Sequence, residues 1–384
     1  MNVSRETWPM VRLGEVCEVR GKTISNFSDL GSTPYVGLEH LNQGGGFLQV
    51  SQVDAEDPKS AKNQFESGDV LFGRLRPNLR KVALASFEGV CSTDIVVLVP
   101  SMQIEAEYLK NYLLTDTCLA QVLQRVNGIN LPRISTKDLL QVAIPFPPLA
   151  EQRRIAEILE GSAGSIQRAR ALLEKQSSLP VQIVRNYLDR AEQLVPLKDV
   201  CKFAGGSTPS KSNGEYWNGT IPWFSSKDLK ADNLSDSIDH VTSLAIEKTS
   251  LKPTVEPSIA VSLRGMSLAH SVPMSIIPQG ACVNQDLKTI IPNDPRDLNL
   301  LFYSLKCREP YLLSKVSSSA HGTKKLDFNH LKEVLVPEVS QEDIERLNRM
   351  IRQTLNTREL LSRKLNLFQQ LHQSLATRAF AGQL

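Results

Sequence analysis

The chain is a tandem repeat with a period close to 190 residues, and this repeat constrains the fold more than any other feature of the sequence. Residues 13–17 (LGEVC) match residues 197–201 (LKDVC), and residues 126–145 (VNGINLPRISTKDLLQVAIP) match residues 319–337 (SAHGTKKLDFNHLKEVLVP). Each copy ends in an Ile-Pro or Val-Pro step, followed by a helical pattern of about 40 residues. The expected order is globular unit, long helix, globular unit, long helix.

The first long helix is predicted to follow a proline-rich corner in the segment PFPPLAEQRRIAEILE (145–160). Prolines fix φ and lack an N–H, so the chain stays extended until the helix formers begin. Each helix then carries a single apolar stripe at intervals of three and four residues, which requires a partner. We therefore expect an antiparallel coiled coil that returns the C-terminal segment to the first unit. The predicted interface residues are Ile155, Ile158, Leu159, Ile166, Leu173, Ile344, Leu347, Ile351, Leu355, Leu365 and Phe368.

Each globular unit is predicted to have a mixed α/β (α+β) fold, and the repeat predicts a pseudo-two-fold arrangement. Short β-branched runs alternate with turn clusters, and one short helix is expected in each unit, near residues 105–114 and 297–305. The predicted parts are residues 1–148 (first unit), 149–192 (first spacer helix), 193–339 (second unit) and 340–384 (second spacer helix).

Composition excludes several classes of protein. The formal net charge of +3 is too small to indicate nucleic-acid binding by itself, so any such function must rest on local basic clusters. There is no apolar run of about 18 residues that would span a membrane, and the N-terminal residues lack the apolar core of a signal peptide. The six cysteines are far apart, which argues against zinc or a disulfide framework and favours the reducing cytoplasm.

Motifs for catalysis are missing from the sequence. The GKT at residues 21–23 lacks the glycine that a phosphate-binding loop requires five positions earlier, where Val16 stands. No GxGxxG, HExxH or GxSxG motif occurs, and the six histidines are scattered singly. We therefore predict a chain without catalytic activity and without a metal site.

Basic side chains gather in the segment GRLRPNLRKV (73–82), directly after a predicted buried strand. A rigid junction that carries several guanidinium groups suits phosphates and the O6/N7 edge of guanine, and an asparagine suits adenine. The matching segment of the second unit, SLRGMSLAH (262–270), keeps one arginine. For each of these two segments, the alternative to nucleic-acid binding is a basic turn that is only exposed to solvent.

Further candidates come from the loops GINLPRIS (128–135) and HGTKKL (321–326), and from IPWFSSKDL (221–229), where an aromatic and a lysine could contact a sugar–phosphate backbone. Packing of the tryptophan inside its unit is the alternative. The predicted nucleic-acid contacts are Arg74, Arg76, Asn78, Arg80, Lys81, Asn130, Arg133, Trp223, Lys227, Arg264, His321, Lys324 and Lys325.

Three segments resemble the specificity subunits of type I restriction–modification systems over nearly the whole chain. They are PFPPLAEQRRIAEIL after the LPRIS segment, GGSTPSKSNGEYWNGTIPWFSSKDL (205–229) and SLATRAFAGQL (374–384). The second hinge, VPEVSQEDIERL (336–347), departs from the pattern because it lacks the PPL and EQ elements.

The resemblance implies two target-recognition domains, each reading half of a bipartite site in double-stranded DNA, and a coiled coil that acts as a spacer. It implies methyltransferase (M) and restriction (R) subunits as partners, with S-adenosylmethionine, ATP and Mg²⁺ on those partners and no cofactor on this chain. Two alternatives stay open: a DNA-binding coiled-coil scaffold, and a specificity module of another methyltransferase system. A nuclease or a methyltransferase fragment would need motifs that the sequence lacks.

Overall fold

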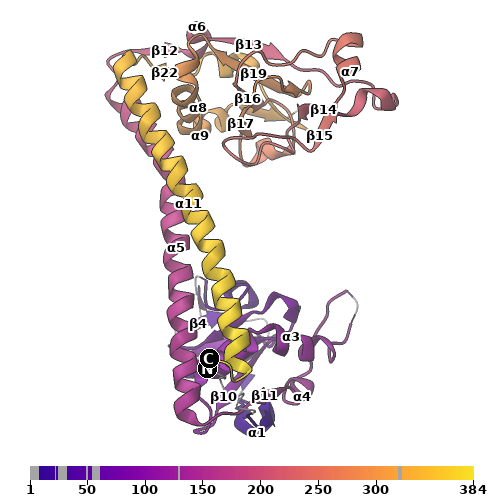
Figure 1. The fold of residues 1–384 in the computed structure, drawn as a ribbon, viewed down its shortest axis with the longest axis vertical. Helices are drawn as coiled ribbons and strands as arrows, with labels where there is room; N and C mark the ends of the chain where they lie inside the picture. The colour runs from indigo at the N-terminus through magenta and orange to yellow at the C-terminus, as the bar shows by residue number, and fades with distance from the viewer. Residues whose placement is uncertain are drawn as a thin grey trace. The chain divides into compact units, whose positions relative to one another are not determined.

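The structure is a computed structural model and describes residues 8–21, 23–24, 33–48, 51–53, 61–128, 130–318 and 322–384. The chain divides into two compact units. Unit 1 comprises Met1–Arg170 and Arg363–Leu384, and unit 2 comprises Ala171–Ser362. Each unit therefore contains one globular part and a portion of both long helices (Figure 1).

The described residues of unit 1 form two larger sheets and one two-stranded sheet. The strands are β1 (Met10–Arg12), β2 (Cys17–Val19), β3 (Thr23–Ile24), β4 (Thr33–Val36), β5 (Ser51–Val53), β6 (Lys62–Phe65), β7 (Val70–Gly73), β8 (Val82–Leu84), β9 (Gly89–Cys91), β10 (Ile95–Pro100) and β11 (Ala143–Pro145). The helices are α1 (Leu13–Val16), η1 (Leu38–His40), η2 (Pro77–Leu79), α2 (Ala106–Leu113), α3 (Asp116–Leu123), α4 (Thr136–Leu139) and the start of α5 (Leu149–Arg190). One sheet has the order β2-β10-β7-β8 and the other β3-β6-β9-β4-β5, while β1 pairs with β11.

Unit 2 repeats this plan. Its strands are β12 (Leu194–Pro196), β13 (Cys201–Gly205), β14 (Trp217–Phe224), β15 (Asp239–Val241), β16 (Ser258–Ser262), β17 (Met274–Ile277), β18 (Cys282–Val283), β19 (Leu287–Pro292), β20 (Val316–Ser318), β21 (Lys324–Leu326) and β22 (Leu335–Pro337). Its helices are α6 (Leu197–Val200), η3 (Gly214–Tyr216), α7 (Ser243–Lys248), η4 (Met266–Ala269), η5 (Pro295–Asp297), α8 (Leu298–Cys307), α9 (Glu309–Ser314), α10 (Phe328–Lys332) and the start of α11 (Gln341–Phe380).

The two units share the topology of their four-stranded sheet, whereas the second sheet has five described strands in unit 1 and three in unit 2. The four-stranded sheet β13-β19-β16-β17 of unit 2 has the order of β2-β10-β7-β8 in unit 1. The second sheet of each unit contains one parallel pair, β4 with β9 in unit 1 and β14 with β18 in unit 2. The central strands β7 and β16 are fully buried and rich in apolar residues, which suits a strand covered on both faces. The mixed α/β class and the internal repeat are confirmed.

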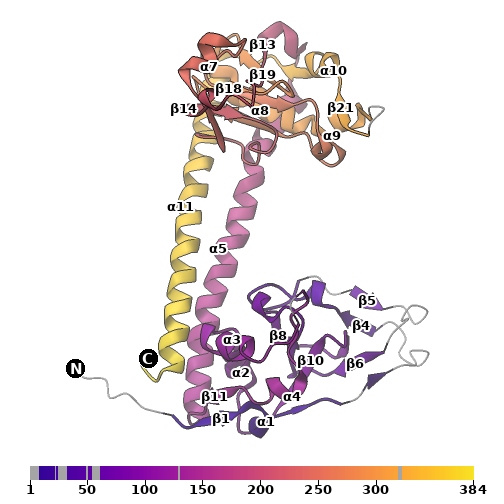
Figure 2. The same ribbon diagram turned by 90° about the vertical axis from the view of Figure 1, so that its right-hand side faces the viewer.

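In unit 1, α2 lies between the four-stranded sheet and the pair of long helices (Figure 2). Tyr108 and Tyr112 of α2 are fully buried and form aromatic pairs with Phe380 of α11. The Tyr108 hydroxyl donates to the Pro145 carbonyl at 2.8 Å, and burial raises the pKa of this phenol above its usual range. The C-terminal part of α11 is thereby built into the core of unit 1, together with Leu159 of α5.

The long helices run antiparallel within each unit, as predicted. In unit 1, Ser162 of α5 contacts His372 of α11, with 2.6 Å between Oγ and Nδ1, and Arg154 donates to the Leu384 carbonyl. The core of unit 2 includes Val184 of α5 and Leu347 of α11. Of the predicted interface residues, five are buried and six are half-buried. The buried residues are Ile155, Leu159, Ile344, Leu347 and Ile351, and the half-buried residues are Ile158, Ile166, Leu173, Leu355, Leu365 and Phe368.

The short helices expected near residues 105–114 and 297–305 correspond to α2 and α8. Each unit also has short helices that the sequence analysis did not foresee, such as α3, whose start is capped by the Thr115 side chain. Helix α5 continues through Pro180 to Arg190. No helix in the described parts of the chain is long and apolar enough to cross a membrane.

Candidate nucleic-acid interface

In unit 1, two loops from distant parts of the sequence meet at the end of strand β7. The Arg74 amide donates to the Asp94 carbonyl at 2.9 Å, and the Ile134 amide donates to the Arg74 carbonyl at 3.1 Å. The Arg76 amide donates to the Pro132 carbonyl at 2.8 Å. We call residues 74–81 and 130–134 junction 1. The structure thus brings together the two basic segments that the sequence analysis identified separately in this unit.

Junction 1 presents polar and cationic side chains. Arg76, Asn78 and Asn130 are exposed, and Arg74 is half-buried with an Nε that has no hydrogen-bond partner among the described residues. Arg133 is 48% exposed and lies 2.7 Å from the Asp94 carboxylate. Among the described residues, Asp94 is the carboxylate that pairs with Arg133, and a guanidinium has five N–H donors, more than one ion pair uses.

The backbone of junction 1 is held in an uncommon conformation. Arg76 and Arg80 both have φ of +49°, the left-handed region that costs a residue with a Cβ about 1–2 kcal/mol. Surrounding hydrogen bonds sustain this conformation: the Leu79 amide donates to the Arg76 carbonyl at 3.0 Å. Non-glycine residues in this region cluster at functional sites, so the conformation marks the loop as a candidate site.

Two of the predicted contacts in junction 1 are engaged inside the unit. Arg80 donates to the Leu114 carbonyl at 3.1 Å and forms an ion pair with Asp116. Hydrogen bonds from Arg80 and Gln373 hold the pKa of the Asp116 carboxyl below its usual range. Lys81 donates to the carbonyl of Leu38. These contacts orient the two basic residues toward their own unit.

Unit 2 repeats the backbone pattern of junction 1. The Leu263 amide donates to the Asp286 carbonyl at 2.9 Å, and the Leu326 amide donates to the Leu263 carbonyl at 3.0 Å. The Gly265 amide donates to the Lys324 carbonyl at 3.1 Å. We call residues 263–270 and 324–326 junction 2. The three hydrogen bonds match those of junction 1 in order, and they place Leu263 where unit 1 has Arg74.

Junction 2 presents fewer guanidinium groups than junction 1. Arg264 and Lys325 are exposed and face each other across an antiparallel bridge, and Lys324 Nζ donates to Ser318 Oγ at 2.8 Å. Gly265 stands in the place of Arg76 and also has a positive φ, +138°. The predicted contact His321 lies outside the described residues.

The aromatic candidate of unit 2 needs correction. Trp223 is 4% exposed, and its ring N–H donates to the Ser207 carbonyl at 3.0 Å. Its ring also packs edge-on against Trp217, with 5.1 Å between centroids. Trp223 is therefore a packing residue of the unit, because its ring is buried and its ring N–H is already bound to Ser207. Lys227 is 50% exposed and forms an ion pair with Asp239 at 2.7 Å.

Two exposed apolar residues in the junctions were missed by the sequence analysis. Leu131 of junction 1 is 58% exposed, and Met266 of junction 2 is 65% exposed. Both lie beside cationic residues, in loops fixed by the hydrogen bonds described above. The signal that could have revealed them is a large apolar residue inside a basic, turn-rich segment, where a core position is not expected.

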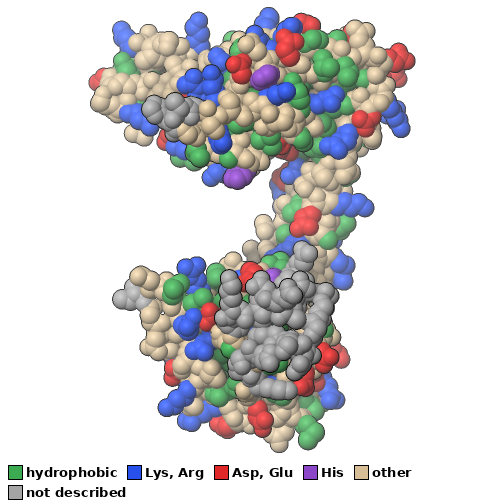
Figure 3. Space-filling model, turned by 180° about the vertical axis from the view of Figure 1, so that it is seen from behind, with side chains coloured by type: hydrophobic (Ala, Val, Ile, Leu, Met, Phe, Trp, Pro, Cys, Tyr) green, Lys and Arg blue, Asp and Glu red, His purple; other side chains and the backbone are tan. Residues whose placement is uncertain are grey.

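The face shown in Figure 3 carries no broad basic patch. On the face shown in Figure 3, the Lys and Arg side chains of each unit are interspersed with acidic and apolar ones. Among the described residues, no group of three or more His, Cys, Asp or Glu side chains is placed to hold a metal ion. All six cysteines are free thiols. The features that distinguish the junctions are their backbone hydrogen bonds and their exposed side chains.

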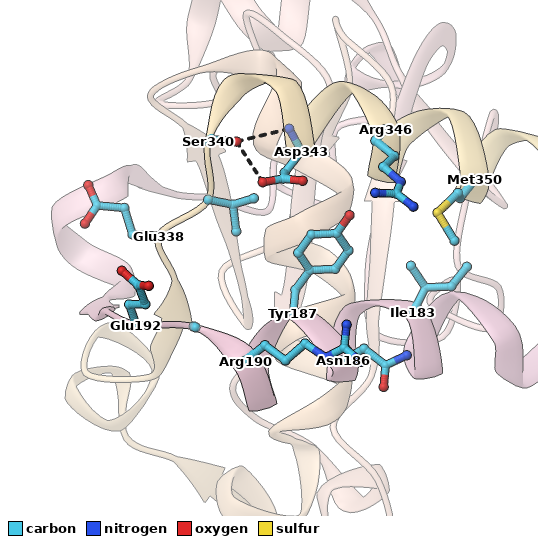
Figure 4. Close-up of a pocket in the computed structure, with 12 residues that line it drawn as sticks. Ile183, Asn186, Tyr187, Arg190, Glu192, Glu338, Ser340, Asp343, Arg346 and Met350 are labelled. Carbon is cyan, nitrogen blue, oxygen red and sulfur yellow. Dashed lines mark hydrogen bonds between the residues drawn. The ribbon is translucent and has the colours of Figure 1, made fainter.

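A cleft of about 490 Å³ opens in unit 2 where α5 ends and α11 begins (Figure 4). Ile183 lies beside Met350 at one end, and Ser340 caps α11 by accepting from the Asp343 amide at 3.2 Å. The charged lining residues are Arg190, Glu192, Glu338, Asp343 and Arg346. Three carboxylates against two guanidinium groups make this cleft a poor site for a phosphate.

The complete fold resembles a solved chain from a structural study of the complex assembly and conformational transition of a type I restriction–modification system. The alignment covers 98% of both chains, with a TM-score of 0.62 and 22% identity. This likeness establishes the class of fold: two α/β units joined by two long helices.

The family model described as the type I restriction modification DNA specificity domain matches residues 5–167 and 192–365, so the chain belongs to this family. One relative, the EcoR124I/EcoR124II specificity subunit of Escherichia coli, is 26% identical over 253 residues, covering 62% of this chain and 63% of the relative. Another, the EcoDI specificity subunit of Escherichia coli, is 30% identical over 154 residues, covering 40% of this chain and 34% of the relative. The matches thus span about a third to two thirds of the relatives' length.

Proposed function

We propose that this chain is the DNA sequence-specificity subunit of a type I restriction–modification complex, and that each unit reads one half of a bipartite site. The observation that carries the proposal is the pair of junctions. Both are fixed by the same three backbone hydrogen bonds, yet they present different side chains. A fixed backbone with variable side chains is what two different half-sites require of one repeated fold.

In unit 1, Arg76 and Asn78 at the exposed tip of the loop are proposed to read base edges, with Arg74 beside them. Guanidinium groups donate to guanine O6 and N7, and an asparagine amide pairs with adenine N6 and N7. Arg133 and Asn130 on the second loop contact phosphates or the adjoining bases. Arg80 and Lys81 hold the loop in place through their contacts within the unit.

In unit 2, Arg264 and Lys325 are the proposed principal cationic contacts, supported by Lys324 and Lys227. The ion pair of Lys227 with Asp239 is exposed, so exchange of the carboxylate for a phosphate costs little. His321 stays a candidate from its sequence position beside this loop. Because each phosphate contact releases a counterion, binding through these residues weakens as salt rises.

The long helices are proposed to set the spacing of the half-sites and to recruit methyltransferase and restriction subunits. In this proposal, the chain itself binds no cofactor and catalyses no reaction. S-adenosylmethionine, ATP and Mg²⁺ act on the partner subunits, in the cytoplasm. The functional division into 1–148, 149–192, 193–339 and 340–384 belongs to the same proposal.

The test is co-expression of the chain with a methyltransferase subunit of its own system, followed by mapping of adenine methylation in the host DNA. A bipartite methylated motif that disappears when this gene is removed supports the specificity role. Unchanged methylation, together with binding of DNA by the purified complex, would favour the alternative of a DNA-binding coiled-coil scaffold. Methylation of a motif with one continuous recognition sequence would favour a module of another methyltransferase system.

The spacer role has its own test. Four residues inserted into α5 lengthen a helix by about 6 Å, at 1.5 Å per residue. The methylated motif is then expected to keep both half-sites and change only the number of base pairs between them. If the number of base pairs between the half-sites stays the same, the helices do not control the separation of the half-sites.

A further inference from the structure

Met266 stands at the exposed tip of junction 2, on the first turn of η4. It is 65% exposed, although part of its loop is anchored in the core of the unit. Leu268 of the same turn is 1% exposed and belongs to the core of unit 2, as does Val272. The Val272 amide also donates to the Glu309 carboxylate at 2.7 Å. The thioether is therefore displayed by a fixed loop and is not part of a frayed segment.

Cationic and polar groups surround this methionine. Arg264 precedes it by two residues, and the Gly265 amide donates to the Lys324 carbonyl, which draws β21 and its exposed Lys325 alongside η4. His270 at the end of the loop is exposed as well. A surface with this charge favours an anionic partner, whereas the methionine itself offers no strong donor or acceptor.

The chemistry of base edges identifies what such a residue can contact. In the major groove, bases present donors, acceptors and one apolar group, the C5-methyl group of thymine. A methionine is flexible and polarizable and packs well against a methyl group. We propose that Met266 contacts the C5-methyl group of a thymine in the half-site read by unit 2. This inference rests on the proposed function and names a specificity-determining residue for it.

The register of the repeat supports a difference between the two units at this point. Met266 follows Gly265 as Pro77 follows Arg76, and Pro77 is buried. In the loop that follows the buried strand, junction 1 thus offers guanidinium and amide donors and junction 2 offers an apolar side chain; the exposed apolar residue of junction 1, Leu131, lies on its second loop. The first unit is suited to polar base edges, and the second to a base pair that displays a methyl group.

The experiment uses the full chain in complex with its methyltransferase subunit and a duplex that carries the mapped motif. Each thymine of both half-sites is replaced in turn by deoxyuridine, which removes only the methyl group and preserves pairing. Dissociation constants are measured by fluorescence anisotropy at one salt concentration. For the unaltered chain, we expect one position to weaken binding about 4-fold, the effect of burying one methyl-sized group.

The Met266→Ala variant is expected to bind the unmodified duplex about 10-fold more weakly and to be insensitive to deoxyuridine at that position. Met102→Ala is the matched control, because Met102 is 97% exposed outside both junctions and should leave both measurements as in the unaltered chain. The sensitive position should also lie in the half-site that an Arg74→Ala/Arg76→Ala variant still recognises.

Several outcomes would overturn the inference while the proposed function stands. They are a motif without a thymine in that half-site, no deoxyuridine effect in the unaltered complex, and an undiminished effect in Met266→Ala. Loss of affinity in Met266→Ala without any deoxyuridine effect would instead indicate insertion between base pairs. Failure of the unaltered complex to bind the motif would overturn the proposed function itself.

Discussion

The two junctions share three backbone hydrogen bonds and differ in chemistry. Junction 1 has Arg74 and Arg76 where junction 2 has Leu263 and Gly265, and the same three hydrogen bonds hold both loops. Since these bonds involve only main-chain atoms, they place no demand on the exposed side chains of the loops, such as Arg76 and Met266. The comparison shows how one repeated unit can change its ligand without changing its architecture.

The hinges before the long helices, by contrast, differ at a buried position. In unit 1, Gln152 is fully buried; it accepts from the Glu105 amide at 2.8 Å and donates to the Pro147 carbonyl at 2.9 Å. Ile344 is buried at the corresponding position of unit 2, 192 residues later (344 − 152 = 192). The offset is that of Asp286 from Asp94 (286 − 94 = 192). The degenerate second hinge thus replaces a polar anchor with an apolar one.

The largest expected effect comes from removing the guanidinium groups of junction 1. Arg74→Ala/Arg76→Ala should weaken binding to the motif about 100-fold, since each good contact to a base contributes about 1–3 kcal/mol. Electrophoretic mobility shift at fixed salt measures this, and circular dichroism checks the fold. The control is Arg153→Ala, an exposed arginine of α5 that pairs with Glu105. An unchanged footprint over both half-sites would exclude the arginines from recognition.

The second effect concerns the hinge of unit 1. Gln152→Ile installs the residue type of unit 2 and leaves buried main-chain groups without partners, so unfolding should become easier by about 2 kcal/mol. The control Ile344→Val removes one methylene in unit 2 and should cost about 1 kcal/mol. Thermal unfolding followed by circular dichroism gives both values. If Gln152→Ile is as stable as the unaltered chain, the polar anchor is not needed.

Substitutions at the matching positions of positive φ in the two junctions should have a smaller effect on stability. Gly265 has φ of +138° and ψ of +160°, a region open almost solely to glycine, so Gly265→Ala should destabilise unit 2 by about 1–2 kcal/mol. Arg76→Gly should leave stability nearly unchanged, because glycine adopts φ of +49° without strain, and should weaken DNA binding. Equal losses of stability in both variants would contradict this account.

The smallest expected effect is a pH dependence confined to the helix pair of unit 1. Burial lowers the pKa of His372 from 6.5, and its Nδ1 lies 2.6 Å from Ser162 Oγ; the nearby charges are those of Glu160, which opposes the shift, and Lys110. The unfolded chain therefore takes up the proton first. The stabilisation is present above about pH 6.5 and is lost as the pH falls through the lower value of the folded state.

His372→Gln should reduce the fall in Tm between pH 7.5 and 5.0 by about 2 °C. Unit 2 has Pro180 at the corresponding position (372 − 180 = 192), so no similar response is expected there. The same substitution at the exposed His270 serves as the control. Identical pH profiles for His372→Gln and the unaltered chain would exclude the effect.

The sequence predicted those features that depend on local periodicity or on repetition. The helices α5 and α11, their antiparallel pairing and the mixed α/β units all follow from the apolar stripes and the repeat. The junction loops were also found, because basic residues follow a buried strand in both copies. Membership of the family is confirmed by the matching model.

The side-chain environments could not be predicted, because they depend on contacts between distant residues. Arg80 pairs with Asp116, 36 positions away, and Trp223 donates to Ser207, 16 positions away. Neither contact leaves a periodic signal in the sequence. Met266 was missed for a related reason: an apolar residue gives no local indication of exposure until the anchoring of its loop is known.

The way in which the chain is divided between the two units also determines the order in which they can fold during synthesis. Unit 2 is one continuous stretch, Ala171–Ser362, and it can reach its native contacts as soon as that stretch has left the ribosome. Unit 1 needs Ala379 and Phe380, which are translated after all of unit 2, to complete the core around Tyr108. The N-terminal unit is therefore the last to mature. A chain that lacks its last residues would therefore have a folded second unit and an incomplete first unit that proteases can cleave.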